Sequence, residues 1–306
     1  MKKDGAEREG MTLRAGLICA IVCYALWGVL PVYWKALSFI PSPEIFAHRV
    51  LWSFVFMAVV CVFWRRFDPR PYFRDRRALL LLAAAGAAVS CTWGIYIYAV
   101  NSGHIVEASL GYYINPLLSI IAGVVFFGEK LTAFQKIATG LAAAGVLYFS
   151  FDYGVFPWIS VALAVFFGLY GALKKKGGYP PAPALAIETS LMAPLAVVFI
   201  ICTFARPERV FLTMNGPWPP WGAVAGLICG GAVTAAPLLL FARAANSVPL
   251  STIGFTQYLS PTLSLLIGVF VYKEPFTQAH LICFALIWTG LLLVSLEAAR
   301  RRPAET

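Results

Sequence analysis

Residues 107–132, EASLGYYINPLLSIIAGVVFFGEKLT, are repeated in modified form at residues 251–277, STIGFTQYLSPTLSLLIGVFVYKEPFT. The two stretches match at an offset of 145 positions. The pairs they share are Tyr113 with Tyr258, Pro116 with Pro261, Ser119 with Ser264, Gly123 with Gly268, Glu129 with Glu274 and Thr132 with Thr277. Leucines match by chance in apolar chains, whereas Pro, Gly, Glu and Thr at one fixed offset indicate an internal duplication.

The composition is that of a membrane protein. Of the 306 residues, 60% are hydrophobic and 12% are charged, against roughly 25% charged in soluble domains. The apolar residues form ten blocks whose length suits a helix that spans a bilayer. The blocks are residues 14–34, 43–64, 78–99, 105–127, 131–150, 155–173, 183–204, 219–241, 250–272 and 277–298. An all-α membrane protein with ten transmembrane helices is predicted, and the first block is expected to be retained because no cleavage site precedes it.

The ten blocks divide into two repeats of five, residues 1–150 and 151–306. Because five is odd, the second repeat must enter the membrane from the opposite side, which makes the two halves inverted repeats. This arrangement is typical of secondary transporters, whose substrate site lies near the midplane between the repeats.

The net charge of +10 is distributed unevenly along the chain. Under a ten-helix topology, the arginines at 65–77, the lysines at 174–176 and the arginines at 300–302 all fall on the same side as the N-terminus. The positive-inside rule then places both termini in the cytoplasm, and no nucleic-acid partner is expected. The seven cysteines lie inside spans without a CxxC pair, so we expect packing roles and no metal or cofactor.

Three ionisable residues stand near the start of the second block. Glu44 and His48 are four positions apart and share a helix face, and Arg49 follows directly. Charged groups inside a membrane are costly and are functional candidates by default. Glu44 and His48 are a candidate protonatable pair, with Arg49 binding an anionic group or keeping Glu44 ionised. The structural alternative is an ion pair that joins this helix to a neighbour.

Two prolines are expected to kink the fourth and ninth spans. Pro116 leaves the carbonyl of Tyr112 without its helical hydrogen bond, and Pro261 does the same to the carbonyl of Gln257. Free carbonyls inside a bilayer occur only beside protein or a water-filled cavity. The side chains of Asn115 and Gln257 can each donate and accept hydrogen bonds there. These kinks therefore predict the substrate site, although helix packing alone would also explain the two prolines.

The other candidates are aromatic or acidic. We expect Trp27, Trp93, Tyr96 and Tyr258 to line the pathway together with Tyr112, and Glu107 and Glu188 to add intramembrane charge. Aromatic rings would suit a planar or apolar substrate group, while packing alone would also account for Trp27. We assign the turns around Glu129 and Glu274 to helix connection and capping. We expect Trp34 and Lys35 to anchor the first span at the membrane surface.

Several motifs resemble one transporter family. They are HRVLWSF at 48–54, EASLGYYINPL at 107–117, GEK at 128–130, STIGF at 251–255 and QYLSPTL at 257–263. Together they are similar to the RarD group of EamA-type carriers in the drug/metabolite transporter superfamily, over residues 14–298. The resemblance implies a ten-helix carrier of the bacterial inner membrane, embedded in lipid, with two inverted repeats and a small-molecule substrate. It transfers no residue-level site.

The expected function is secondary transport of a small organic solute, such as an amino acid, metabolite or drug, by alternating access. Proton coupling would run through Glu44 and His48. ATP drive is not expected because no GxxxxGK[ST] motif is present. A flippase for a lipid-linked intermediate stays open, because it would use the same fold. A membrane-embedded transferase is disfavoured, since His48, His104 and His280 are scattered and no HExxH motif accompanies them.

Overall fold

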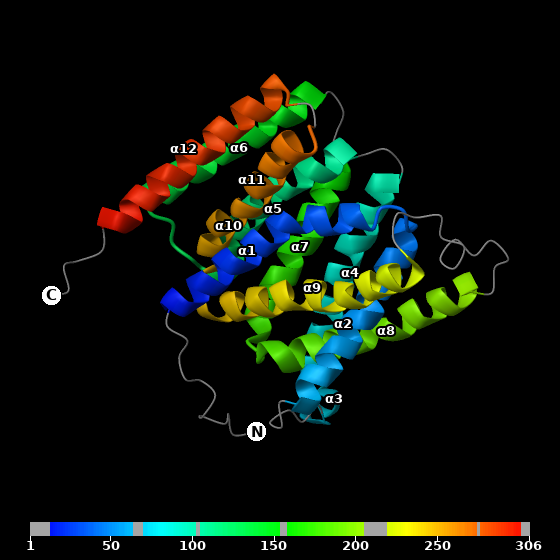
Figure 1. The fold of residues 1–306 in the computed structure, drawn as a ribbon. Coiled ribbons are helices and arrows are strands. Elements are labelled where there is room, and N and C mark those ends of the chain that lie inside the picture. The colour runs from blue at the N-terminus through cyan, green and yellow to red at the C-terminus, as the bar shows by residue number, and fades with distance from the viewer. Residues whose placement is uncertain are drawn as a thin grey trace.

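A computed structural model describes residues 13–63, 70–101, 105–153, 158–204, 219–273 and 276–300, and its regular elements there are all helices (Figure 1). In chain order they are α1 (Leu13–Ala36), α2 (Ser42–Phe63), α3 (Arg70–Arg74), α4 (Arg76–Asn101), α5 (Ile105–Phe127), α6 (Ala133–Tyr153), α7 (Trp158–Gly177), α8 (Pro181–Phe204), α9 (Pro220–Ser247), α10 (Leu250–Gln257), α11 (Leu259–Leu266), the π-helical segment η1 (Ile267–Val271) and α12 (Gln278–Arg300).

The prediction of an all-α membrane protein is confirmed. Each predicted block contains one long helix, except that the ninth is divided among α10, α11 and η1. Among the described residues, nine segments are long and apolar enough to cross a membrane. The predicted span that does not qualify is the one that contains α6, which has 21 residues but carries Gln135 and Lys136 in its first turn. Length and apolarity thus support nine of the ten predicted spans.

The helices pack in pairs that correspond between the two halves of the chain. Helix α1 packs on α9, and its counterpart α7 packs on α4. In the same way α1 packs on α10 and α11 while α7 packs on α5, and α2 packs on α9 while α8 packs on α4. The pairs α2 with α8, α5 with α10 and α6 with α12 join counterparts directly. This pattern is consistent with two inverted repeats related by a two-fold axis.

Glycines at the repeat offset make close contacts between α6 and α12. A methyl group on Gly145 of α6 would lie 3.1 Å from the backbone oxygen of Cys283 in α12. A methyl group on Gly290 of α12 would lie 3.0 Å from the Cα of Ala138 in α6. Gly145 and Gly290 are 145 positions apart, and so are Ala138 and Cys283. The two helices therefore pack backbone against backbone in the manner of small-residue membrane interfaces, side by side along one edge of the molecule (Figure 1).

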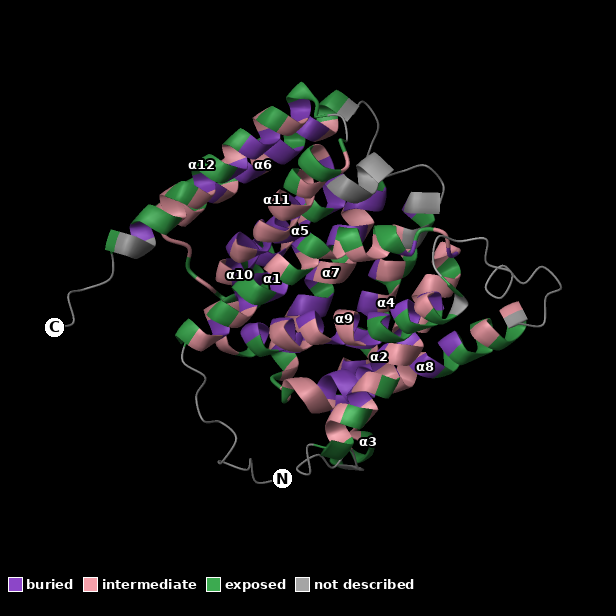
Figure 2. Ribbon diagram, viewed as in Figure 1, coloured by how far each residue is buried: buried purple, intermediate pink, exposed green. Residues whose placement is uncertain are grey.

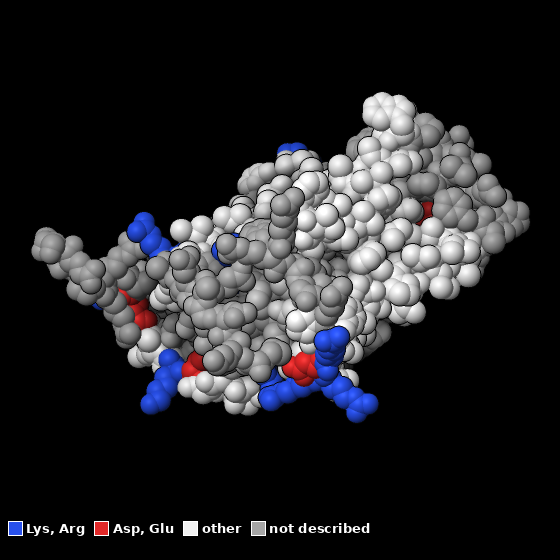
Figure 3. Space-filling model, turned by 90° about the horizontal axis from the view of Figure 1, so that it is seen from below, with Lys and Arg blue, Asp and Glu red and all other residues white. Residues whose placement is uncertain are grey.

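Burial and charge agree with a membrane setting. Buried residues concentrate where helices cross, while exposed and half-buried residues lie on the outer faces of the helices (Figure 2). Seen from below, the described Lys and Arg side chains lie over the left and middle of this face, most of them toward its lower edge (Figure 3). The start of α1 and the end of α12 lie on one side of the molecule (Figure 1).

The two prolines act differently on their helices. Helix α5 runs through Pro116 without interruption, whereas the ninth segment breaks at Tyr258, three residues before Pro261. Where α5 and α10 cross, a methyl group on Gly254 would lie 2.7 Å from the carbonyl oxygen of Pro116. The turn of α5 that contains Pro116 thus packs backbone to backbone against α10, the first part of the broken ninth segment.

Candidate functional site

The crossing of α2 and α9 places Arg49 inside the helix bundle. A methyl group on Gly231 would lie 2.3 Å from the backbone of Trp52, so only glycine permits this approach. The hydroxyl of Ser53 donates to the carbonyl of Gly231 over 3.3 Å. One turn away, Arg49 Nε donates to Thr234 Oγ1 over 3.2 Å. The small residues of α9 thus hold the guanidinium against a polar side chain of the second repeat.

Aromatic rings surround the guanidinium. Its Cζ atom lies 4.3 Å from the ring centroid of Trp34 and 4.8 Å from that of Trp93, both cation–π distances. The phenols of Tyr33, Tyr96 and Tyr112 lie close enough to act on its charge. We call this set the Arg49 cluster: Tyr33, Trp34, Arg49, Trp93, Tyr96, Tyr112 and Thr234. It draws on α1, α2, α4 and α5 of the first repeat and on α9 of the second.

The Arg49 cluster is accessible. Tyr112 is 42% exposed, although its ring lies 5.9 Å from that of Tyr96 and within electrostatic range of Arg49. Arg49, Trp93 and Tyr96 are half-buried. A guanidinium that faced lipid would be costly, so its accessible side must face water or a ligand. Four of the predicted site residues, Arg49, Trp93, Tyr96 and Tyr112, therefore come together at one place.

Glu44 and His48 lie on the same helix but are not joined to each other by any bond that the structure describes. His48 Nδ1 accepts a hydrogen bond of 3.2 Å from Trp52 Nε1. Glu44 is half-buried, and its carboxylate has no partner among the described residues. The groups that act on the charge of Arg49 are phenols, not Glu44. The second reading of Arg49, in which it keeps Glu44 ionised, gains no support from this geometry.

Trp27 belongs to a different aromatic group. Its ring centroid lies 5.5 Å from Tyr24, 5.5 Å from Phe167 and 5.9 Å from Phe241. These rings form part of the largest buried cluster, where α1, α7 and α9 meet. Trp27 thus packs between the repeats, against the same core as Trp93 of the Arg49 cluster.

The remaining candidates of the two repeated stretches are buried. Gln257 Oε1 accepts a hydrogen bond of 3.1 Å from Ser119, which joins α10 to α5. Asn115, one turn before Ser119 on the same face, is 3% exposed, and its Oδ1 has no partner among the described residues. Tyr258 is buried in an apolar cluster with Tyr113. The side chain of Glu107 lies outside the described residues.

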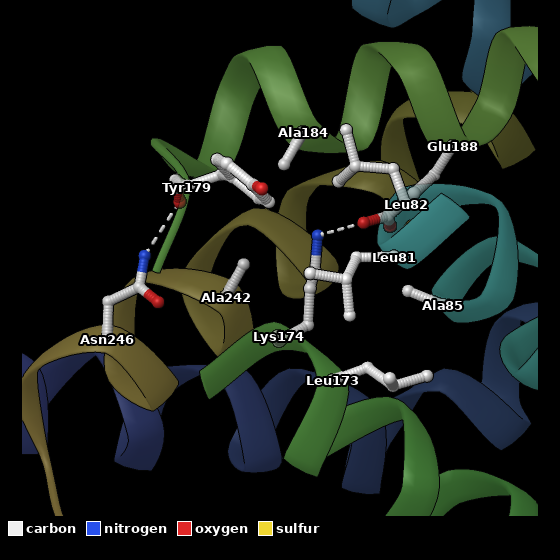
Figure 4. Close-up of a pocket in the computed structure, with 10 residues that line it drawn as sticks. All are labelled: Leu81, Leu82, Ala85, Leu173, Lys174, Tyr179, Ala184, Glu188, Ala242 and Asn246. Carbon is white, nitrogen blue, oxygen red and sulfur yellow. Dashed lines mark hydrogen bonds and ion pairs between the residues drawn. The ribbon is translucent and has the colours of Figure 1, made fainter. Parts of the chain in front are cut away.

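At the other end of the molecule, where α7 ends and α8 begins, Glu188 forms a buried ion pair. Its carboxylate lies 2.6 Å from the ammonium of Lys174, and both side chains are at most 4% exposed. The pair borders a small pocket, at which Asn246 also donates to the carbonyl of Tyr179 (Figure 4). Glu188 therefore lies apart from the Arg49 cluster, and its charge is neutralised.

The same end contains a second ionic link. The carboxylate of Glu129 accepts a hydrogen bond of 2.6 Å from Lys175 and bonds of 2.7 and 2.8 Å from the backbone N–H groups of Leu250 and Ser251. It thereby caps the first turn of α10, where backbone donors lack helical partners. We call this set the Glu129 bridge, and the end that carries it the basic end. It joins the turn after α5 to two helices of the second repeat.

Sequence reasoning missed three members of the Arg49 cluster. Trp34 and Tyr33 end a span beside Lys35, a position where aromatic residues usually mark the membrane surface. Thr234 is a single hydroxyl in an apolar stretch, which only weakly indicates a polar site. The sequence indicates Lys174 only as one of three consecutive lysines at a membrane surface, and not as the partner of Glu188. Within the described residues, no group of three or more His, Cys, Asp and Glu is placed to hold a metal ion.

The fold and the site define a multi-pass, all-α membrane protein that gathers a charge and several aromatic rings inside its helix bundle. A model of the EamA-like transporter family matches residues 14–151 and 157–296. The chain belongs to this family and is a membrane transporter, not an enzyme.

The relatives agree with this assignment. The chain is 40% identical to the uncharacterized transporter YojE of Bacillus subtilis strain 168, over 95% of this chain and 97% of YojE. It is 35% identical to protein RarD of Escherichia coli strain K12, over 93% of this chain and 95% of RarD. A solved structure, described only as the crystal structure of a protein, shares the fold with a TM-score of 0.72 at 17% identity, over 95% of this chain and 100% of that chain. The resemblance to the RarD group is confirmed.

Proposed function

We propose that the protein is a secondary carrier of the bacterial inner membrane that moves a small organic solute, such as an amino acid, metabolite or drug. The observation that carries the proposal is the Arg49 cluster, an accessible charged and aromatic site to which helices of both repeats contribute. In transporters built from two repeats, the substrate site lies between them. The solute would bind at the Arg49 cluster, with Trp34 and Trp93 as its aromatic walls.

Alternating access requires contacts between the repeats that can be made and broken at each end. At the basic end, the Glu129 bridge is such a contact. At the opposite end, Lys35 of α1 lies 3.8 Å from the ring of Tyr272, and Tyr33 donates to the carbonyl of Gly226. In the proposed cycle one set of contacts opens while the other stays closed. Both termini and the basic end of the molecule would face the cytoplasm.

The test compares the metabolites of cells that express the protein with those of cells that lack it, inside the cells and in the medium. Wild-type protein is expected to redistribute a small set of soluble metabolites. Trp93→Ala is expected to reduce this effect about tenfold, because it removes a ring that contacts Arg49. Trp221→Ala, at a tryptophan that is 75% exposed on α9, is the matched control and should keep the effect.

Three results would contradict the proposal. Equal metabolite distributions in cells with and without the protein would remove the carrier function. A change confined to lipid-linked species, with soluble metabolites unaltered, would favour a flippase on the same fold. Equal losses in the Trp93 and Trp221 variants would separate transport from the Arg49 cluster.

A further inference from the structure

Arg49 carries a positive charge that no described residue neutralises. The two other buried or half-buried cations described near the helix ends, Lys174 and Lys175, each pair with a glutamate at 2.6 Å. Among the described residues, the ionisable groups that act on the charge of Arg49 are phenols, which are neutral near pH 7. Ionisable side chains inside membrane proteins almost always pair with one another or with carbonyls. An unpaired guanidinium there leaves a place for an anion.

The hydrogen-bonding capacity of Arg49 supports the same inference. A guanidinium has five N–H donors in one plane. Among the described residues Arg49 makes one hydrogen bond, from Nε to Thr234. Its other donors are not among the buried polar atoms that lack a partner, so they reach accessible space. Trp34 and Trp93 stabilise the charge through their ring faces but offer no acceptor for these donors.

We propose that Arg49 is the anion anchor of the transported solute, and that the solute carries a carboxylate bound by the guanidinium. This inference rests on the carrier function proposed above and specifies its substrate class. A carboxylate matches the two parallel N–H donors of a guanidinium in a bidentate pair. One carboxylate also balances one guanidinium, whereas a phosphate dianion would need a second cation. The apolar part of the solute would lie against Trp34, Trp93 and Tyr112.

Three probes that differ only in the head group test the proposal: 3-phenylpropionate, 3-phenylpropanol and 3-phenylpropylamine. The full-length protein is held in nanodiscs of neutral lipid at pH 7, and binding is measured by titration calorimetry. The carboxylate is expected to bind at least about tenfold more tightly than the alcohol or the amine. Arg49→Gln is expected to weaken binding of the carboxylate at least about tenfold. Arg49→Lys is expected to weaken it less, because lysine keeps the positive charge but lacks the two parallel N–H donors of the guanidinium.

Arg243→Gln is the matched control, since Arg243 is exposed near the basic end of α9 and the same change there should leave binding unaltered. The proposal is overturned if the carboxylate binds no more tightly than the alcohol and amine, or if Arg49→Gln binds it as wild type does. Should Arg49→Gln fail to fold, the wild-type comparison of the three head groups decides alone.

The metabolite comparison separates failure of this inference from failure of the carrier function. Redistributed solutes that bear a carboxylate support both. Redistributed solutes that are all neutral or cationic would keep the carrier function and overturn the anion anchor. The absence of any redistributed solute would count against the carrier function, and the anchor would fall with it.

Discussion

At the scale of single residues, Glu129 joins three segments through one carboxylate. Its oxygens bind the ammonium of Lys175 and two backbone N–H groups at the start of α10. Gly123 makes room for it, because a methyl group there would lie 2.5 Å from Glu129 Oε2. Burial of this carboxyl group raises its pKa, but the hydrogen bonds from Lys175, Ser251 and Leu250 outweigh burial and hold the pKa below its ordinary value.

This lowered pKa predicts how stability depends on pH. Because the folded-state pKa lies below the unfolded value of about 4.3, the ionised Glu129 stabilises the fold fully above that pH. The contribution is lost as the pH falls through the lower, folded-state value. At pH 7, Glu129→Gln is expected to cost about 2 kcal/mol, since hydrogen bonds to a charged group are lost. Thermal melting of the purified protein in detergent, at several pH values, measures this difference.

The melting difference between wild type and Glu129→Gln should be constant above about pH 5 and shrink below about pH 4. Asp152→Asn, at an exposed carboxylate on the last turn of α6, is the control and should show a small difference throughout. A difference for Glu129→Gln that grows as the pH falls would refute the assignment.

Single residues also show where prediction from sequence succeeds. Arg49 stands out because a charge in an apolar span has a high cost, and that cost is visible in the sequence. Trp27 and Trp34 look alike in the sequence, yet one packs in the core and the other covers the guanidinium. Which way an aromatic ring faces depends on how α1 crosses its neighbours, and this information is not local to the chain.

At the scale of elements, the turns that follow α5 and η1 each contain a residue with a positive φ at matched positions of the two repeats. Gly128 has a φ of 64°, and Lys273, 145 positions later, has a φ of 57°. In the first turn Gly128 N–H bonds to the carbonyl of Val124, which is the bond of the αL motif at helix ends, and Glu129 N–H bonds to the carbonyl of Gly123. A left-handed conformation costs a residue with a side chain roughly 1–2 kcal/mol. The second turn therefore carries strain that the first avoids.

Opposite substitutions should have opposite effects on stability. Gly128→Ala is expected to lower the unfolding free energy by about 1 kcal/mol, because nothing crowds the new methyl group and only the backbone is strained. Lys273→Gly is expected to raise it by up to about 1 kcal/mol for the same reason. A change of this size shifts the melting temperature by a few degrees, which differential scanning fluorimetry resolves.

Lys130→Gly is the control, because Lys273 is the only residue with a side chain and a positive φ among those described. This control should be neutral or destabilising, since glycine adds entropy to the unfolded chain. A loss of stability in Lys273→Gly would show that its side chain matters more than its backbone. The sequence paired the two turns correctly, but GEK and KEP alone did not predict that a lysine adopts the glycine conformation.

Spans were easier to predict than breaks within them. Their apolar length is a property of the sequence, so each predicted block contains a helix. Pro116 and Pro261 occupy matched positions and look equivalent, yet the helix breaks only in the second stretch. Whether a proline bends or interrupts a helix depends on which neighbours serve the freed carbonyl, and those neighbours come from elsewhere in the chain.

At the scale of the whole molecule, α6 decides between nine and ten spans. It is long enough to cross the membrane and packs along α12, but its first turn is polar. If it crosses, its two ends lie on opposite sides of the bilayer. We expect ten crossings, with Lys136 at the cytoplasmic end of α6 and Asp152 at the outer end.

Cysteine labelling measures this arrangement. In a background without the seven native cysteines, Asp152→Cys is expected to react with a membrane-impermeant maleimide in intact spheroplasts. Lys136→Cys is expected to react only after the membrane is opened. Both positions are exposed, so reactivity reports their side of the membrane. Labelling of both from the same side would remove α6 from the spans and leave the two termini on opposite sides.

The duplication at an offset of 145 anticipated the overall plan, including glycine contacts that the structure places in matched positions on α6 and α12. It did not indicate which helices of one half would meet which helices of the other. The pairing of Arg49 with Thr234 spans 185 positions, and no spacing rule within the sequence predicts a contact of that range. For this reason the sequence predicts several first-repeat residues of the Arg49 cluster but does not predict Thr234, its member from the second repeat.

The close seam between Gly145 and Gly290 has a consequence for how such a molecule can move. Backbones in direct contact resist sliding, because every small shift drives the main-chain atoms of one helix into those of the other. One helix of the seam comes from each half, so a rocking motion of the halves would turn about it as a fulcrum. The α6–α12 pair would then move little during the transport cycle, and the helices farthest from it would be displaced most.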